Sequence, residues 1–251
     1  MTTLTHARTG LPQALAHEWI KFRSVRSLVW TTVAAAVVPV LGAVFVAATG
    51  SLQPDDTVFG AGLTLSVPAQ MLVAVAGALV ITGEYGSGTI RTTPRRATVL
   101  AAKAALLASL TYVSALVSCA LAHVVGDALL DHDRYAQGEP LPALFGIAAS
   151  FTLAALLGLA VGTLVRHSAA AVIAVLGVLL LPSLLGPLFG DAQRWIAGSS
   201  PTATLQKLTQ TSDATAETVG SLGPWPSLLL VAICTAALLL LAALTLRRRD
   251  A

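Results

Sequence analysis

A short stretch after the second apolar run of the chain carries side chains that could bind a partner. Residues 84–91 read EYGSGTIR, which offers a carboxylate in Glu84, an aromatic ring in Tyr85 and a guanidinium in Arg91. Glycines at 83, 86 and 88 predict that the preceding helix is interrupted here. Thr93 and Pro94 then predict the start of a new helix, and Arg95 and Arg96 follow at once. Arginines in a first turn oppose the helix dipole, so we infer that they contact lipid phosphate or another protein surface.

Motifs for catalysis are missing from the sequence. No lysine follows a glycine, so the phosphate-binding pattern GxxxxGK[ST] is absent and the chain has no P-loop for ATP. His17 and Glu18 begin a zinc-protease pattern, but Lys21 occupies the place of the second histidine. Ser87 has glycines at the wrong offsets for a nucleophile elbow. We therefore expect no enzyme activity, no cofactor and no metal in this chain.

Six long apolar runs determine the fold class. Each lacks charged side chains and is close to the roughly 20 residues that a helix needs to cross a bilayer. These runs are 28–49, 63–83, 104–126, 144–165, 169–190 and 228–246. A soluble helical domain would need polar faces that these runs do not have. The sequence predicts an all-α integral membrane protein with a six-helix transmembrane domain over residues 28–246 and a basic tail over 247–251.

The distribution of charge predicts the orientation in the membrane. With the N-terminus inside, the cytoplasmic segments hold 12 of the 15 basic residues, and the outer segments hold nine of the 12 acidic residues. The positive-inside rule then places both termini in the cytoplasm of a multi-pass protein of the inner (plasma) membrane. The net charge of +3 follows from this topology and from anionic lipids, so we expect membrane lipids and not nucleic acid as partners.

The N-terminal segment, residues 1–27, has the periodicity of an interfacial helix. Apolar residues recur there at steps of three and four, which is typical of an amphipathic helix lying in the cytoplasmic interface. A solvated basic tail stays open as the alternative. The segment is longer than the charged region of a secretory signal, so we expect a retained anchor. Its expected interfacial residues are Trp19, Lys21, Phe22, Arg23 and Arg26.

Polar and small residues within the spans indicate tight helix packing. Gln70 is the strongest polar side chain in any span, whereas carriers driven by protons or sodium usually place charged residues at mid-membrane. A row of small residues at every fourth position runs through the fourth span and ends at Gly158 and Gly162. Gln70, Gly158 and Gly162 are therefore candidates for helix packing or for the pathway. Pro182 and Pro187 should kink or shorten the fifth span.

The chain resembles the permease subunits of ATP-binding-cassette exporters of the second type, the ABC-2 family. The likeness rests on EWIKFRSVRSLVW at 18–30, GEYGSGTIRTTPRR at 83–96 with VLAAK after it, and six spans with a longer outer connection before the last. EY followed by GTIR is its most specific part, and the chain departs from the family pattern at Gly86, where a larger polar residue is common.

The resemblance implies a function and partners. Two permease chains, as a homodimer or with a paralogous permease, would form the pathway, and a separate ABC ATPase subunit would supply ATP and magnesium. The segment that couples to the ATPase would comprise Glu84, Tyr85, Gly88, Thr89, Ile90 and Arg91. A pathway lined by Ala, Leu and Val fits a hydrophobic or amphipathic substrate.

Two other functions stay open on the sequence. The first is an ATP-independent carrier or channel of six spans, and the second is a membrane anchor or immunity protein that transports nothing. His123, near the outer end of the third span, is expected to be a satisfied interfacial histidine and not a proton relay.

Overall fold

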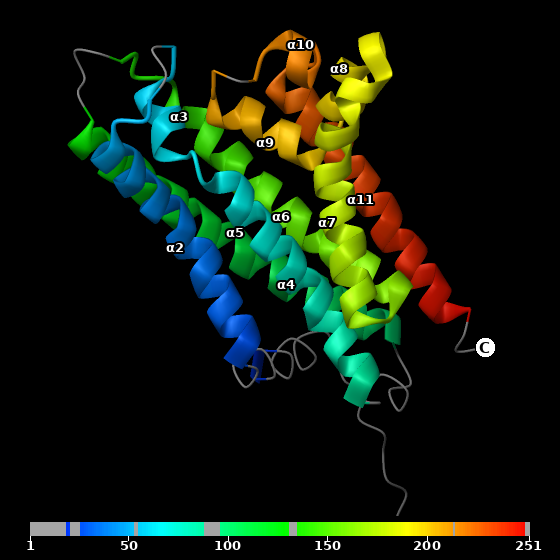
Figure 1. Ribbon diagram of the computed structural model, residues 1–251. Coiled ribbons are helices and arrows are strands. Elements are labelled where there is room, and N and C mark those ends of the chain that lie inside the picture. Colours follow the sequence, from blue (N-terminus) through cyan, green and yellow to red (C-terminus); the bar gives the residue numbers. More distant parts are fainter. Residues whose placement is uncertain are drawn as a thin grey trace, which may run out of the picture.

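The computed structural model describes residues 19–20, 26–52, 55–87, 96–130, 135–212 and 214–248, and these are mostly helical (Figure 1). Within these ranges no strand forms, and extended backbone pairs in an isolated bridge between Thr57 and Ala136. Six of the described helices are long and apolar enough to cross a membrane. The prediction of an all-α chain with six membrane-spanning segments is therefore confirmed.

The six long helices form an elongated bundle. They are α2 (Arg26–Thr49), α4 (Ser66–Ser87), α5 (Arg96–Leu129), α6 (Pro140–Val165), α7 (Ser168–Leu185) and α11 (Pro224–Arg247). Successive long helices run in opposite directions, so α2 begins and α11 ends at the same end of the bundle (Figure 1). We call this the Glu84 end, after a residue in the last turn of α4, and we call the opposite end the Lys207 end.

The second span differs from the sequence prediction at both of its ends. Leu63 is the C-cap of the short helix α3 (Val58–Gly62), and α4 begins at Ser66. At its other end α4 continues through Gly83 and Gly86 to Ser87, so the prediction that these two glycines interrupt the helix was wrong. A glycine costs a helix only about 1 kcal/mol relative to alanine, and contacts of neighbouring side chains outweigh this amount. Glu84 and Tyr85 are thus helical residues.

The third and fifth spans also differ in length from their apolar runs. Helix α5 extends over 34 residues because Lys103 and Asp127, which bound the charge-free run, are both compatible with a helix. Helix α7 ends at Leu185, five residues before the expected Gly190. Pro187 lacks a backbone N–H and restricts the residue before it, so residues 186–192 form the 3₁₀ helix η2 (Gly186–Ala192) instead.

The core of the bundle is the contact between α4 and α6, which pack more extensively against each other than any other described pair. Three glycines let the two backbones touch. A Cβ atom on Gly158 would lie 1.9 Å from the carbonyl oxygen of Ala74, and one on Gly77 would lie 2.0 Å from that of Ala155. A Cβ atom on Gly162 would lie 2.7 Å from the carbonyl oxygen of Ala78. We call Gly77, Gly158 and Gly162 the α4–α6 seam. The small residues of the fourth span form the groove in which α4 packs.

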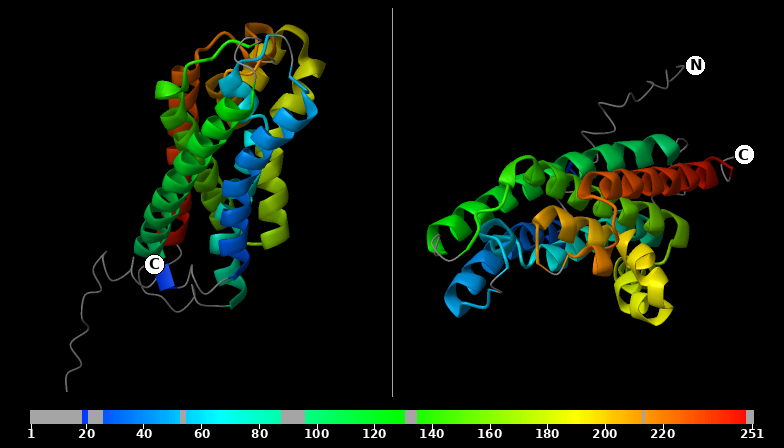
Figure 2. Two further views of the ribbon diagram at one scale, coloured as in Figure 1. Left: turned by 90° about the vertical axis from the view of Figure 1, so that its left-hand side faces the viewer. Right: turned by 90° about the horizontal axis from the view of Figure 1, so that it is seen from above.

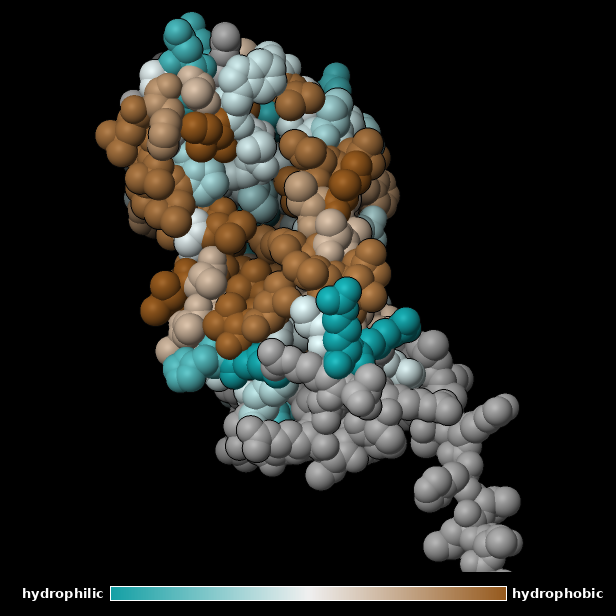
Figure 3. All heavy atoms as spheres, turned by 90° about the vertical axis from the view of Figure 1, so that its right-hand side faces the viewer, coloured by the Kyte–Doolittle hydropathy of each residue, from teal (hydrophilic) through white to brown (hydrophobic). Residues whose placement is uncertain are grey.

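The other long helices surround this pair and expose apolar side chains. Two thirds of the apolar window of α6 is buried (67%), against 17% for α7. Leu184 on α7 and Leu229 and Ile233 on α11 are among the exposed large residues. The face that carries α7 and α11 shows a broad apolar band across its middle (Figure 3). This distribution is expected for a bundle whose outer surface contacts lipid.

Short helices gather at the Lys207 end, in the upper part of Figure 1. Helix α3 packs there against α2 and α5, whereas η2, α8 (Gln193–Gly198), α9 (Pro201–Thr209) and α10 (Ala216–Val219) form a second group toward α7 and α11. Helix α9 lies across the ends of the long helices, as the view from above also shows (Figure 2). Its N-cap Ser200 accepts a hydrogen bond from the amide of Ala203 at 3.0 Å, and most of its residues are buried. The sequence predicted only a longer connection in this region.

Candidate coupling site

The predicted coupling residues fall partly within the described ranges. Glu84 and Tyr85 lie in the last turn of α4. Four further predicted coupling residues lie outside the described residues, and these are Gly88, Thr89, Ile90 and Arg91. In the predicted interfacial segment Trp19 is helical and exposed, and Arg26 begins α2, whereas Lys21, Phe22 and Arg23 lie outside the described residues.

Glu84 forms an ion pair with Lys103 of the neighbouring helix α5. The Lys103 ammonium donates a hydrogen bond to Glu84 Oε1 at 2.8 Å, and the two side chains are only 4% and 15% exposed. Removing one partner of such a buried pair typically costs 3–5 kcal/mol, because the other charge stays buried. The carboxylate at the end of α4 is therefore engaged within its own chain, and the pair ties α4 to α5.

Tyr85, the next residue, contacts α6 and the residue that follows it, on the side of α4 away from α5. Its hydroxyl donates to the carbonyl oxygen of Thr163 on α6 at 3.4 Å. The Arg166 guanidinium lies over its ring, 5.4 Å from the centroid, which is within the range of a cation–π interaction. Arg166 is the C-cap of α6 in a left-handed conformation (φ 62°) and immediately precedes the N-cap of α7. Tyr85 thus ties α4 to the connection between α6 and α7.

These residues form one continuous group at the Glu84 end, which we call the Glu84 cluster: Glu84, Tyr85, Lys103 and Arg166. It joins the last turn of α4 to α5 on one side and to α6 and α7 on the other. A displacement of the chain segment after α4 would therefore be carried to three helices at once. The cluster thus places one carboxylate, one phenol and two cations in contact with each other or with the backbone of α6.

Sequence reasoning missed Lys103 and Arg166 as partners. It counted both among the basic residues of the cytoplasmic segments, and it gave the segment that includes Glu84 an ATPase subunit as its expected partner. One signal was present. Glu84 directly follows one charge-free run and Lys103 directly precedes the next, so consecutive antiparallel spans place the two charges at the same depth.

The other candidate residues lie along the contact between α4 and α6. Gln70 is completely buried, and its Nε2 donates to Ser150 Oγ on α6 at 3.0 Å and to the Pro201 carbonyl oxygen on α9 at 3.2 Å. Gly158 and Gly162 belong to the α4–α6 seam. The amide of Gln70 on α4 therefore links α6 to α9 at the Lys207 end.

Histidine, cysteine and acidic side chains do not cluster in the described ranges. No group of three or more of them lies close enough to hold a metal ion there. His123 contacts the ring of Phe59 edge to face, with the centroids 5.4 Å apart. Cys119 and Cys234 lie on different helices, α5 and α11.

Four long apolar helices around the glycine-packed pair of α4 and α6, with a charged cluster at one end, define a multi-pass membrane protein. The family model for ABC-2 family transporter proteins matches residues 14–183, which is more than half of the chain. The chain therefore belongs to the ABC-2 transporter family, and the resemblance seen in the sequence is confirmed. The matched region contains the whole Glu84 cluster. A comparison with curated proteins gave no match.

Family membership makes this chain a membrane permease component. Permeases of this family generally lack a nucleotide-binding domain of their own and generally work with an ABC ATPase.

Proposed function

We propose that this chain is the membrane-spanning subunit of an ABC exporter and that a separate ATPase subunit binds at its Glu84 end. Family membership supports the transport role. The observation that carries the coupling role is the Glu84 cluster, in which a buried ion pair and a cation–π contact join the end of α4 to α5, α6 and α7. The exported substrate is hydrophobic or amphipathic, as the apolar spans suggest.

The proposed orientation places the Glu84 end in the cytoplasm of the plasma membrane. Basic residues within or next to the last two turns of the long helices there are Arg26, Arg96, Lys103, Arg166, Arg247 and Arg248. Acidic residues at the other end are Asp55, Asp56, Asp127, Glu139, Asp191 and Glu217. The positive-inside rule favours this orientation. Both termini and the segment after α4 then face the compartment that contains ATP.

In this mechanism the chain contributes positioning and no chemistry. The ATPase binds ATP and magnesium and moves when it hydrolyses the nucleotide. The segment that follows α4, with Gly88, Thr89, Ile90 and Arg91, receives that motion. The Glu84–Lys103 pair passes the motion to α5, and the contact of Tyr85 with Arg166 passes it to α6 and α7. A second copy of the chain, or a paralogous permease, completes the pathway.

The test is a charge-swap series on the Glu84–Lys103 pair. The single changes Glu84→Lys and Lys103→Glu should each reduce permease-stimulated ATP hydrolysis and ATP-dependent transport in proteoliposomes, because each places two like charges together. The double change Glu84→Lys with Lys103→Glu restores the attraction and should restore both activities. The ATPase subunit for these assays is expressed from a neighbouring gene or co-purified with the permease in mild detergent.

Two outcomes would overturn the proposal. Transport without any ATPase would indicate a carrier or channel, and failure of every ATPase to bind or respond would indicate a non-transporting anchor. Orientation is checked on the same preparations with single cysteines in place of Thr211 and Arg248. An impermeant reagent added outside should label only the first.

A further inference from the structure

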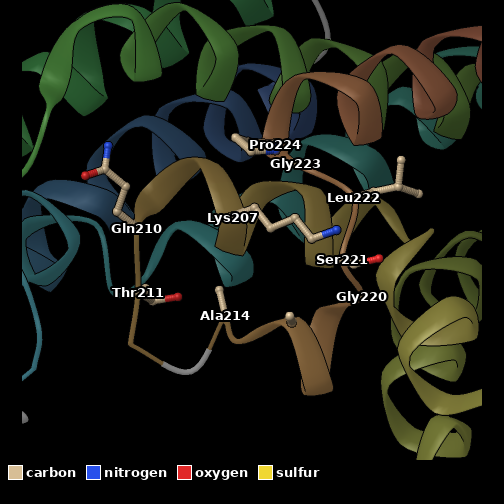
Figure 4. Close-up of a pocket in the computed structure, with 10 residues that line it drawn as sticks. Lys207, Gln210, Thr211, Ala214, Gly220, Ser221, Leu222, Gly223 and Pro224 are labelled. Atoms are coloured by element: carbon tan, nitrogen blue, oxygen red, sulfur yellow. The ribbon is translucent and has the colours of Figure 1, made fainter. Parts of the chain in front are cut away.

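A pocket at the Lys207 end has no role in the proposed coupling mechanism. It has a volume of about 330 Å³ and lies between α9, α10 and the turn that precedes α11. Lys207 of α9 forms one wall, and Gly220 and Ser221 of the turn form another (Figure 4). Ala214, from the connection between α9 and α10, also lines it. Three separate segments thus surround one ammonium group.

The bonding of Lys207 is unusual for a partly buried lysine. Its Nζ donates to the carbonyl oxygen of Gly198 at 3.3 Å and to Ser227 Oγ at 3.0 Å, and both acceptors are neutral. Among the residues that the structure describes, no carboxylate forms an ion pair with it. Burial lowers the pKa of the Lys207 ammonium below its ordinary value of 10.5. An ammonium has three protons to donate, and two are used.

The rest of the pocket can accept an anion. Gln210 does not compete for the ammonium, because its amide is bonded to the backbone of Glu139 through Nε2 at 2.9 Å and Oε1 at 3.1 Å. In Figure 4 the Gln210 side chain points away while Lys207 extends toward the turn with Ser221. Ser221 is exposed, and its hydroxyl has no hydrogen-bond partner in the described part of the chain.

We propose that the Lys207 pocket binds a phosphate group, with the Lys207 ammonium as its charge partner and Ser221 as a further donor. A phosphate supplies the negative charge that the described neighbours of Lys207 do not supply, and its oxygens accept from the ammonium and the hydroxyl. The group could be carried by a lipid headgroup or be free in solution. Exposed Trp195 and Trp225 near this end are typical of headgroup depth, so both sources reach the pocket.

The test uses the small number of lysines in the chain, which has only Lys21, Lys103 and Lys207. The full-length protein in maltoside micelles, which contain no phosphate, is acetylated briefly, and modification of each lysine is followed by peptide mass spectrometry. Only the neutral amine reacts, so an anion that raises the Lys207 pKa by one unit slows labelling about tenfold. Inorganic phosphate should slow labelling of Lys207 with saturation, whereas chloride at equal ionic strength should not.

Two further arms identify the source of the phosphate. Mixed micelles with phosphatidylglycerol should protect Lys207 without added phosphate if a headgroup occupies the pocket. Protection by inorganic phosphate alone, with none from the lipid, would assign the pocket to a free anion. Both results support the proposal. No protection of Lys207 in either arm, or equal protection of Lys21, overturns it.

Two variants test the pocket itself. Ser221→Ala removes a donor and should weaken phosphate protection about threefold to tenfold, the usual range for one hydrogen bond. Ala214→Leu places a larger apolar side chain in the pocket while Lys207 itself is unchanged, and it should abolish protection. Wild-type protection in both variants would overturn the proposal.

Asp213 lies outside the described residues but in the same connection as Ala214. If Asp213→Asn alone accelerates labelling of Lys207 as strongly as phosphate slows it, Asp213 is the counterion and the proposal fails. An unchanged phosphate-free rate in this variant supports the proposal.

Discussion

The two ends of the bundle differ in the partners of their buried or partly buried cations. At the Glu84 end, Lys103 faces a carboxylate of its own chain and Arg166 lies over an aromatic ring. At the Lys207 end, the half-buried ammonium has only neutral partners among the described residues. A charge that is neutralised within the chain stiffens the contact between helices. A cation with only neutral partners in the described part of the chain is available to bind a group from outside.

The largest effect is expected from breaking the pair at the Glu84 end. Lys103→Met leaves Glu84 without its lysine partner and should lower the free energy of unfolding by about 3–5 kcal/mol. The double variant Glu84→Gln with Lys103→Met removes both charges and should recover most of this loss. The measurement is unfolding by SDS titration in mixed micelles. Equal losses in the single and double variants would show that the ion pair contributes little.

A smaller effect is expected from the contact between Tyr85 and Arg166. Tyr85→Leu removes the aromatic ring and should cost about 1–2 kcal/mol, whereas Tyr85→Phe keeps the ring and loses only a long hydrogen bond. Arg166→Gln should cost about as much as Tyr85→Leu. The double variant should cost less than the sum of the two, because both changes remove the same contact. Full additivity in the same unfolding assay would contradict the cation–π assignment.

At the Lys207 end a matched change should have less effect on stability. Lys207→Met removes an ammonium with two neutral acceptors and should cost about 1 kcal/mol or less, because the lost hydrogen bonds are offset by the relief of desolvation. The comparison with Lys103→Met is direct, since the two substitutions are the same. A larger loss for Lys207→Met than for Lys103→Met would reverse the contrast between the ends.

The smallest expected effect is a pH dependence. Because the folded-state pKa of Lys207 lies below 10.5, the unfolded chain binds more protons between these two values, and the stability of the wild-type chain rises with pH there. Relative to Lys207→Met, the wild-type chain should therefore gain free energy of unfolding as the pH approaches 10.5. A loss over this interval would show that the ammonium is stabilised by an internal counterion.

Periodic features of the sequence predicted the parts of the fold that depend on local pattern. The six apolar runs predicted the number of spans. The small residues at every fourth position through Gly158 and Gly162 identified the face of α6 that packs closely, and its partner in the structure is α4. Both depend on repetition along one helix, which is visible in a single sequence. The residues that these glycines contact on α4 were not predicted.

Features that depend on contacts between helices were missed. Glu84 and Lys103 are 19 residues apart, and nothing local distinguishes Lys103 from Arg91 as a partner. The same contacts keep α4 helical through Gly83 and Gly86, where propensity alone favours a break. Helices α8, α9 and α10 were not predicted because they are short and lack the long apolar periodicity of the spans.

The length of α5 has a geometric consequence. Its 34 residues extend about 51 Å, which exceeds the roughly 30 Å of hydrocarbon in a bilayer by some 20 Å. The ion pair of Lys103 with Glu84 fixes α5 near its N-terminal end, and Leu129 lies about 39 Å further along the helix. A pivot of about 5° at Lys103 then sweeps Leu129 through roughly 3 Å, close to the length of one residue in an extended strand. The far tip passes beside Gly62 of α3, where a Cβ on Gly126 would lie 3.2 Å from the Gly62 Cα. A tilt too small to alter the pairing of Glu84 with Lys103 is thus enough to shift the backbone contact with α3 at the opposite surface of the membrane.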